Sequence, residues 1–152
     1  MAVHREKAKA KVSIAIWAAL GLAVTACGGA PETGVSIEPG FVRTPSAGAP
    51  ATAGYLTITS AEDDRLLRVA TDLARTVEIH TVENNNGVMA MRPVDGIDLP
   101  AGEAVALAPG GYHLMIMGPA AEMATAETVT VTLTFEKAGS QVIELPVRRT
   151  AP

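Results

Sequence analysis

The sequence predicts a single all-β domain, a sandwich or small barrel, behind an export leader. From Val35 onward, short β-prone runs alternate with turn residues at roughly ten-residue spacing, which is typical of such folds. No window shows a sustained helical period, and Asp72–Arg75 is expected to form a helical turn at most. The composition agrees, because 48% of the residues are hydrophobic, only 3% are aromatic, and 14 Gly and 10 Pro favour a turn-rich globular body.

The N-terminal segment has the layout of a secretory signal. Four cations precede an uncharged run over residues 12–26, and Cys27 follows directly. Residues 24–27 resemble a bacterial lipobox, in which the cysteine becomes acylated after cleavage. We therefore expect a lipoprotein signal peptide over 1–26 that is cleaved before Cys27, a lipid-anchored tether over 27–34 and a folded domain over 35–149. The alternatives are a signal peptide cleaved elsewhere and an uncleaved anchor. A lipoprotein would be extracytoplasmic and anchored to a membrane, in the periplasm or on the outer face of the cell membrane.

The expected strands are separated by residues that favour turns. Asn84–Gly87, Pro109–Gly111 and Lys137–Ser140 can each supply the positive φ angles that tight connections need. In the segment TVTVTLTF, threonine alternates with apolar residues, which predicts that Val129, Val131, Leu133 and Phe135 face the core. The ten expected strands are Val35–Ile37, Phe41–Arg43, Gly54–Thr59, Arg65–Ala70, Thr76–Val82, Val88–Val94, Glu103–Leu107, Tyr112–Met117, Thr128–Phe135 and Gln141–Val147.

Charge and cysteine content restrict the function. From Cys27 onward the chain carries eight basic and 15 acidic residues, a net charge of −7 that disfavours general nucleic-acid binding. Cys27 is the only cysteine, so the folded domain has no disulfide, no cysteine nucleophile and no thiolate for a blue-copper centre. A GxSxG elbow is absent, and the cluster Glu62–Asp64 lacks EF-hand spacing and is expected to be a solvent-exposed turn.

Histidine and methionine are concentrated in one window. Both histidines of the domain and four of its five methionines lie between residues 80 and 117. Residues two apart share a strand face. Met89 and Met91 therefore lie on one face of their strand, and His113, Met115 and Met117 lie on one face of theirs. If these two strands are adjacent, they present one patch. Each residue alone is typical of core packing, but the set indicates a metal site: His80, Met89, Met91, His113, Met115 and Met117.

The donor chemistry of this set favours one ion. Thioether sulfur is a soft, neutral donor that prefers Cu(I) over Zn(II), Mg(II) or Ca(II), whereas imidazole binds several borderline metals. Methionine also forms no disulfide, so such a site suits an oxidising compartment. The residues therefore predict Cu(I) as the bound metal, and they predict no catalytic activity.

The segments VEIH, GVMAMRPVDGIDLPAGEAVALAPGGYHLMIMGP and VTLTFEKAGSQVIELPV resemble the PCuAC family of periplasmic copper chaperones. The similarity covers about residues 35–149. The metal motif of that family is His, ten residues, Met, 21 residues, His, one residue, Met. Here His80, Met91, His113 and Met115 match it with both long spacings intact.

The resemblance implies a cupredoxin-like Greek-key β-sandwich or barrel and a Cu(I) site made by the four motif residues. Met89 and Met117 are then neighbours of the site, and Thr81 stands where many members have a further methionine. It also implies a copper chaperone that delivers Cu(I) to an extracytoplasmic acceptor, notably cytochrome c oxidase subunit II or another assembly chaperone. The alternatives are a copper storage or resistance lipoprotein without a dedicated acceptor and a structural lipoprotein whose His/Met window is a packed face.

Overall fold

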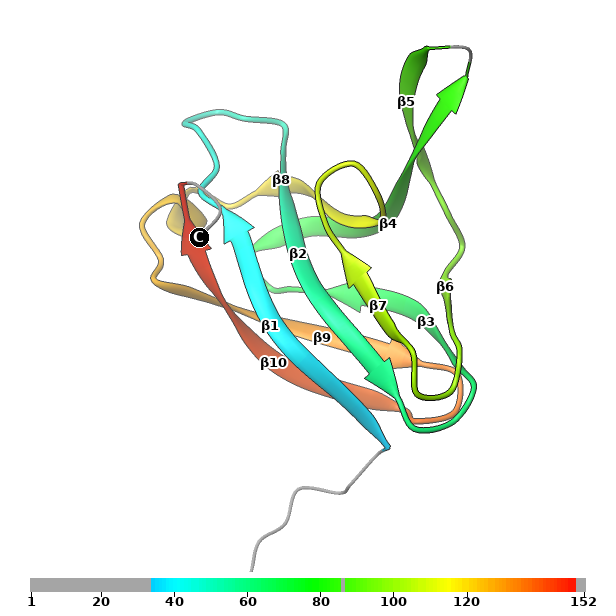
Figure 1. The fold of residues 1–152 in the computed structure, drawn as a ribbon. Coiled ribbons are helices and arrows are strands. Elements are labelled where there is room, and N and C mark those ends of the chain that lie inside the picture. The colour runs from blue at the N-terminus through cyan, green and yellow to red at the C-terminus, as the bar shows by residue number, and fades with distance from the viewer. Residues whose placement is uncertain (1–33, 86, 150–152) are drawn as a thin grey trace, which may run out of the picture. The chain divides into compact units, whose positions relative to one another are not determined.

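The computed structural model describes residues 34–85 and 87–149, and these are almost entirely β (Figure 1). The prediction of an all-β domain is therefore confirmed. The elements are β1 (Val35–Arg43), β2 (Ala51–Ser60), β3 (Asp64–Ala70), β4 (Ala74–Asn85), β5 (Val88–Pro93), β6 (Ile97–Leu99), β7 (Ala104–Leu107), β8 (His113–Pro119), the 3-10 helix η1 (Ala121–Ala124), β9 (Thr128–Phe135) and β10 (Ser140–Arg148).

The strands form a sheet that folds over on itself. Its order is β5-β4-β8-β2-β1-β10-β9-β3-β6, with β7 pairing with β2 beside β8. Among the strands of the described residues, every pairing is antiparallel except that of β1 with β10. Figure 1 shows β1, β2 and β7 in front of β3, β9 and β10, so the two halves of the path make the two layers of a sandwich.

The hydrophobic core fills the space between the layers. The apolar residues of β9 alternate as predicted, and Val129, Val131, Leu133 and Phe135 are all buried. Burial of such side chains stabilises a fold by about 1.5–3 kcal/mol each. The other buried core residues are Val42, Leu56, Ile58, Leu66, Val69, Ile79, Ile97, Leu99, Leu107, Leu114, Ile116, Met123 and Leu145.

Several predicted boundaries were wrong. The two strands expected over Val35–Ile37 and Phe41–Arg43 are one strand, β1, because a β-bulge between Pro39 and Phe41 lets pairing with β2 continue. The helical turn expected over Asp72–Arg75 is instead a turn followed by the start of β4. The sequence patterns also missed β6 and η1, which have only three and four residues.

The acidic cluster at the start of β3 differs from its prediction. Glu62 and Asp63 are exposed, as expected, but Asp64 is buried. Its carboxylate accepts hydrogen bonds from the backbone N–H groups of Arg65 at 2.7 Å, Lys137 at 2.9 Å and Ala138 at 3.0 Å. Asp64 therefore ties β3 to the turn between β9 and β10 rather than facing solvent.

The predicted turns connect the strands. Gly87, Gly110 and Gly139 adopt φ angles of 89°, 87° and 75°, as the turn chemistry requires. The β4–β5 hairpin projects from the sandwich (Figure 1). The predicted leader, residues 1–26, and residues 27–33 of the tether lie outside the described residues. Within residues 34–85 and 87–149, no helix has the length and apolar character to cross a membrane.

Candidate metal centre

Strand pairing brings the two histidines together. β4 and β8 are antiparallel neighbours, and His80 lies directly opposite His113. Directly opposed residues of an antiparallel pair project from the same face of the sheet. The ring centroids are 5.8 Å apart.

The methionines join the same face through register. On β5, Met91 lies opposite Val82 and Met89 opposite Asn84, so both share the face of His80. On β8, Met115 and Met117 share the face of His113. The histidines and methionines of the sequence window therefore lie on one continuous face formed by the three strands β5, β4 and β8. The two methionine-bearing strands are not direct neighbours, because β4 lies between β5 and β8 and contributes His80.

Each histidine has one ring nitrogen held by the protein. The Nε2 atom of His80 lies 2.8 Å from Oε2 of Glu78, and the Nδ1 atom of His113 lies 3.0 Å from the carbonyl oxygen of Gly111. Ligating histidines characteristically donate their second N–H to a carboxylate or a backbone carbonyl in this way.

The other two ring nitrogens are buried without a partner. Among the described residues, Nδ1 of His80 and Nε2 of His113 are the buried side-chain nitrogen and oxygen atoms that make no hydrogen bond. An unsatisfied buried polar atom is costly, so its presence calls for an explanation such as an ion. Two imidazoles on one ion, with bonds of about 2.0 Å, have ring centres about 5 to 6 Å apart. The observed centroid separation of 5.8 Å lies within this range.

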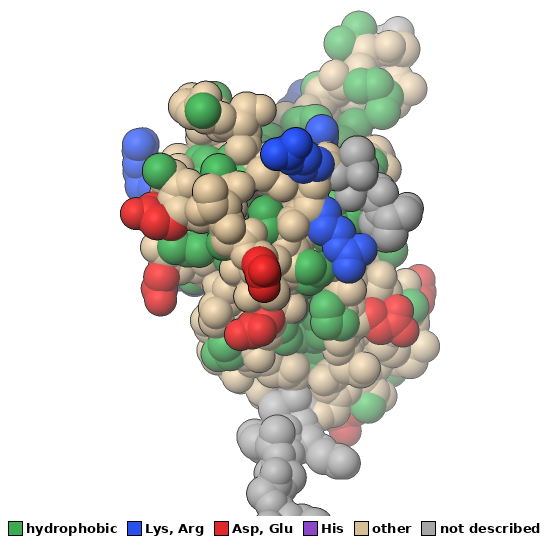
Figure 2. All heavy atoms as spheres, turned by 90° about the vertical axis from the view of Figure 1, so that its left-hand side faces the viewer, with side chains coloured by type: hydrophobic (Ala, Val, Ile, Leu, Met, Phe, Trp, Pro, Cys, Tyr) green, Lys and Arg blue, Asp and Glu red, His purple; other side chains and the backbone are tan. Residues whose placement is uncertain are grey.

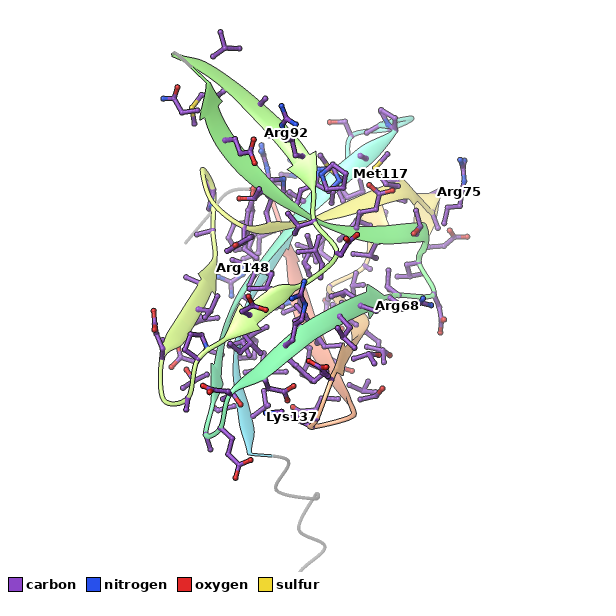
Figure 3. The ribbon with its side chains drawn as sticks, turned by 90° about the vertical axis from the view of Figure 1, so that its right-hand side faces the viewer. Arg68, Arg75, Arg92, Met117, Lys137 and Arg148 are labelled. Atoms are coloured by element: carbon purple, nitrogen blue, oxygen red, sulfur yellow. The ribbon has the colours of Figure 1, made fainter. Side chains whose placement is uncertain are left out.

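The site opens on one side into a cleft of about 510 Å³. Met91, His113 and Met115 line this cleft, and Arg43 lines its rim without any carboxylate among the lining residues. His113 is only 4% exposed, whereas Met91 is 61% exposed. One wall of the site is therefore fixed inside the fold, and another lies on the projecting hairpin. Figure 3 places Met117 and Arg92 at the end of the domain that carries this hairpin, and Lys137 at the opposite end.

The loop before β8 explains how His113 is positioned. β7 and β8 pair one after the other with the same edge of β2. The chain therefore leaves the sheet after Leu107, at the end of β7, and re-enters it at His113, at the start of β8. The turn between them is closed by the Gly111 N–H bond to the Ala108 carbonyl, at 3.1 Å. This turn points the Gly111 carbonyl back at the His113 ring.

Two residues of the site were missed by the sequence analysis. Glu78 precedes His80 by two positions and therefore shares its strand face, which was a usable signal. The role of Gly111 comes from its backbone carbonyl, so its side-chain type carried no signal. Within residues 34–85 and 87–149, no three His, Cys, Asp or Glu residues cluster so that they could hold a metal. The four-residue ligand set stays a prediction.

Comparison with known proteins identifies the family. The model of the family described as "Putative lipoprotein LpqE-like" matches residues 35–147. The chain belongs to the LpqE-like family. It is also 27% identical over 121 residues to "Putative lipoprotein Lxx21020" of Leifsonia xyli subsp. xyli, a match that covers 79% of this chain and 73% of that protein.

Solved structures show that this LpqE-like protein is of the PCuAC type. The copper-bound PCuAC domain from PmoF2 is 28% identical with a TM-score of 0.63, over 78% of this chain and 94% of that domain. Apo-DR1885 from Deinococcus radiodurans is 25% identical with a TM-score of 0.61, over 97% of this chain and 96% of that chain. The expected PCuAC membership and cupredoxin-like β-sandwich are thereby confirmed.

Proposed function

We propose that this protein is an extracytoplasmic copper chaperone that holds Cu(I) with His80, Met91, His113 and Met115 and passes it to an acceptor protein. The observation that carries the proposal is the facing pair of histidines, each with a buried nitrogen that lacks a partner, on the same strand face as the methionines. Relatives of similar fold include a copper-bound PCuAC domain, which supports copper as the cargo.

The donor set selects the oxidation state. Two imidazoles and two thioethers are all neutral, so the ligands do not offset the charge of the bound ion. This suits a monovalent ion, and soft sulfur favours Cu(I) over Zn(II). Cu(II) is stabilised less by thioethers, so a redox enzyme is disfavoured, and we propose a binding protein without catalytic turnover.

The exposure of the site favours transfer over storage. Met91 is on the hairpin and largely exposed, so an incoming donor atom of an acceptor can replace its sulfur while His113 still holds the ion. Exchange of one ligand at a time moves the ion between proteins without releasing it to solvent. The family resemblance points to the copper centre of cytochrome c oxidase subunit II, or to another assembly chaperone, as the acceptor.

The lipobox-like residues 24–27 support an extracytoplasmic location. We propose that Cys27 carries the lipid and holds the domain on the outer side of a membrane. The names of the matching family and of the Leifsonia relative, both of which describe lipoproteins, support an anchored protein.

The test is an anaerobic Cu(I) titration of the purified protein against a chromogenic chelator, with Zn(II) as the control metal. We expect one tightly bound Cu(I) per chain and little zinc. Absence of Cu(I) binding would reject the site and return the four residues to a packing role. Transfer of the ion to a purified subunit II copper domain then separates a chaperone from a storage protein, which would retain it.

A further inference from the structure

The strand position of Glu78 sets it beside the predicted metal site. It lies on β4 directly opposite Met115, on the face that carries both histidines. The hydrogen-bond partner of its carboxylate is the His80 ring: Oε2 of Glu78 lies 2.8 Å from Nε2 of His80. Glu78 is 45% exposed at its side chain, whereas the His80 side chain is only 12% exposed. The contact therefore joins a solvent-facing carboxylate to a half-buried ring.

This contact determines which nitrogen of His80 is free. A carboxylate only accepts hydrogen bonds, so the nitrogen facing it must carry the proton. In a neutral imidazole the other nitrogen, here Nδ1, then has the lone pair, and this Nδ1 is the buried atom without a partner. At His113 the arrangement is reversed, because Nδ1 donates to the Gly111 carbonyl and Nε2 is left free.

We infer that Glu78 is a positioning residue that fixes His80 to bind Cu(I) through Nδ1, while Gly111 fixes His113 to bind through Nε2. The inference rests on the proposed function and adds the binding atoms and the residue that selects them. Without the carboxylate, the ring of His80 can turn about its side-chain torsions and exchange its tautomers. Part of the protein then presents an N–H to the ion instead of a lone pair.

The test combines the tautomer of the apo protein with its affinity for Cu(I). Long-range ¹H–¹⁵N NMR at about pH 8, where unperturbed histidine is neutral, distinguishes the two tautomers. We expect His80 to carry its proton on Nε2 and His113 on Nδ1. Addition of Cu(I) should move the Nδ1 resonance of His80 and the Nε2 resonance of His113.

Two variants separate positioning from structure. Glu78→Ala should give mixed tautomers at His80 and a Cu(I) affinity lower by about ten- to a hundredfold, the usual effect of losing such a partner. Glu78→Gln retains an acceptor oxygen, so its His80 tautomer ratio and its Cu(I) affinity should lie between those of Glu78→Ala and wild type. Glu83→Ala is the matched control, because Glu83 is on the same strand but pairs with Arg92 at 3.0 Å; its affinity should stay within twofold.

The outcomes separate this inference from the proposed function. If Glu78→Ala retains the wild-type tautomer and affinity, or if Cu(I) moves Nε2 of His80, the positioning role is wrong. If the wild-type protein binds no Cu(I), the chaperone proposal fails, and the apo spectra alone still decide whether Glu78 selects the tautomer. Unchanged ¹H–¹⁵N amide spectra outside the site show that Glu78→Ala has folded.

Discussion

The six histidine and methionine side chains on the β5-β4-β8 face differ sharply in exposure. His113 is almost fully buried, Met115 and Met117 are half-buried, and Met89 and Met91 are largely exposed. Buried side chains contribute to stability through packing, whereas exposed ones contribute little. Ligand and packing roles can therefore be separated at the exposed end of the set, where a substitution costs the fold least.

Replacing Met91 and Met115 by leucine tests the sulfur ligands. Leucine keeps the apolar bulk and removes the donor, so Cu(I) affinity should fall strongly in each variant. Stability should be unchanged for Met91→Leu and should fall by less than about 1.5 kcal/mol for Met115→Leu, since this swap nearly conserves volume. Chelator competition measures the Cu(I) affinity, and urea unfolding measures the stability. Met123→Leu, in the core at 0% exposure, is the control that leaves copper binding intact. Unchanged affinity in both site variants would contradict the assignment.

At the residue scale, parity made much of the candidate site predictable. The period of two in strands placed His113, Met115 and Met117 on one face without any structure. The facing of His80 and His113 could not be obtained in this way, because the partner of β4 is set by a long-range pairing that local spacing does not encode. The same holds for the contact between His113 and the Gly111 carbonyl.

The bulge in β1 is the main departure from regular strand geometry. Before it, Ile37 pairs with Ile58 and packs against the core; after it, Val42 pairs with Gly54 and is part of the core. The extra residue changes the parity of the strand, so residues five apart face the same way. After the bulge, Arg43 lines the cleft beside the candidate metal site. Gly40 is the residue at the bulge, and a Cβ there would lie 2.3 Å from the Tyr55 carbonyl oxygen.

Gly40→Ala should therefore be strongly destabilising. The added carbon meets backbone atoms of β2, which cannot move aside as a flexible side chain can. Overpacking of this kind costs about 1–3 kcal/mol or more, which thermal or urea unfolding will detect. Gly111→Ala is the control, because its Cβ would lie 3.8 Å from the nearest atom, an ordinary contact. Equal stability of the two variants would show that β1 can pair with β2 without a glycine at the bulge.

At the element scale, pattern length decided which strands the sequence revealed. Thr128–Phe135 alternates over eight positions and was predicted with its bounds intact, whereas β6 offers only three residues. The gap between Val35–Ile37 and Phe41–Arg43 contains Pro39 and Gly40, both unfavourable in strands, so a break was expected there. Pairing with β2 overrides that local preference.

At the scale of the whole molecule, Asp64 links stability to pH. Partial burial raises the pKa of Asp64, but the backbone N–H groups of Lys137, Arg65 and Ala138 together outweigh it, and the pKa lies below the ordinary aspartate value of 3.8. A carboxylate whose pKa is lower in the folded state stabilises the fold above the pKa of the unfolded chain. This contribution is lost as the pH falls through the lowered pKa of the folded protein.

Asp64→Asn should remove this pH dependence. The neutral amide keeps an oxygen acceptor but loses the charge, and the variant should be less stable at pH 7 by about 2 kcal/mol. The difference from wild type should shrink as the pH falls below about 4, which a series of urea unfolding curves will show. The control is Glu62→Gln at the exposed neighbouring position, which should follow the wild-type curve. A constant difference between Asp64→Asn and wild type at every pH would contradict the role of the charge.

Charge is distributed unevenly over the domain. On the face shown in Figure 2, the basic side chains gather in the upper part, and acidic ones lie mostly below. Arg43 lies opposite Arg148 in the pairing of β1 with β10, and Arg43 lines the cleft. A domain of net negative charge thus has an arginine in the cleft beside the candidate metal site, and such a positive charge favours the approach of acidic groups.

The exposure of Met91 also makes the site sensitive to oxidants. Oxidation of a thioether gives a sulfoxide, which is polar and is reduced again only by dedicated enzymes. Met89 and Met91 are 60% and 61% exposed, so they are the first sulfurs that a peroxide meets, whereas Met115 is half-buried. Oxidative damage would thus begin at the sulfur to which we assign ligand exchange, and a damaged protein would lose the proposed ability to load or release copper while its fold persisted.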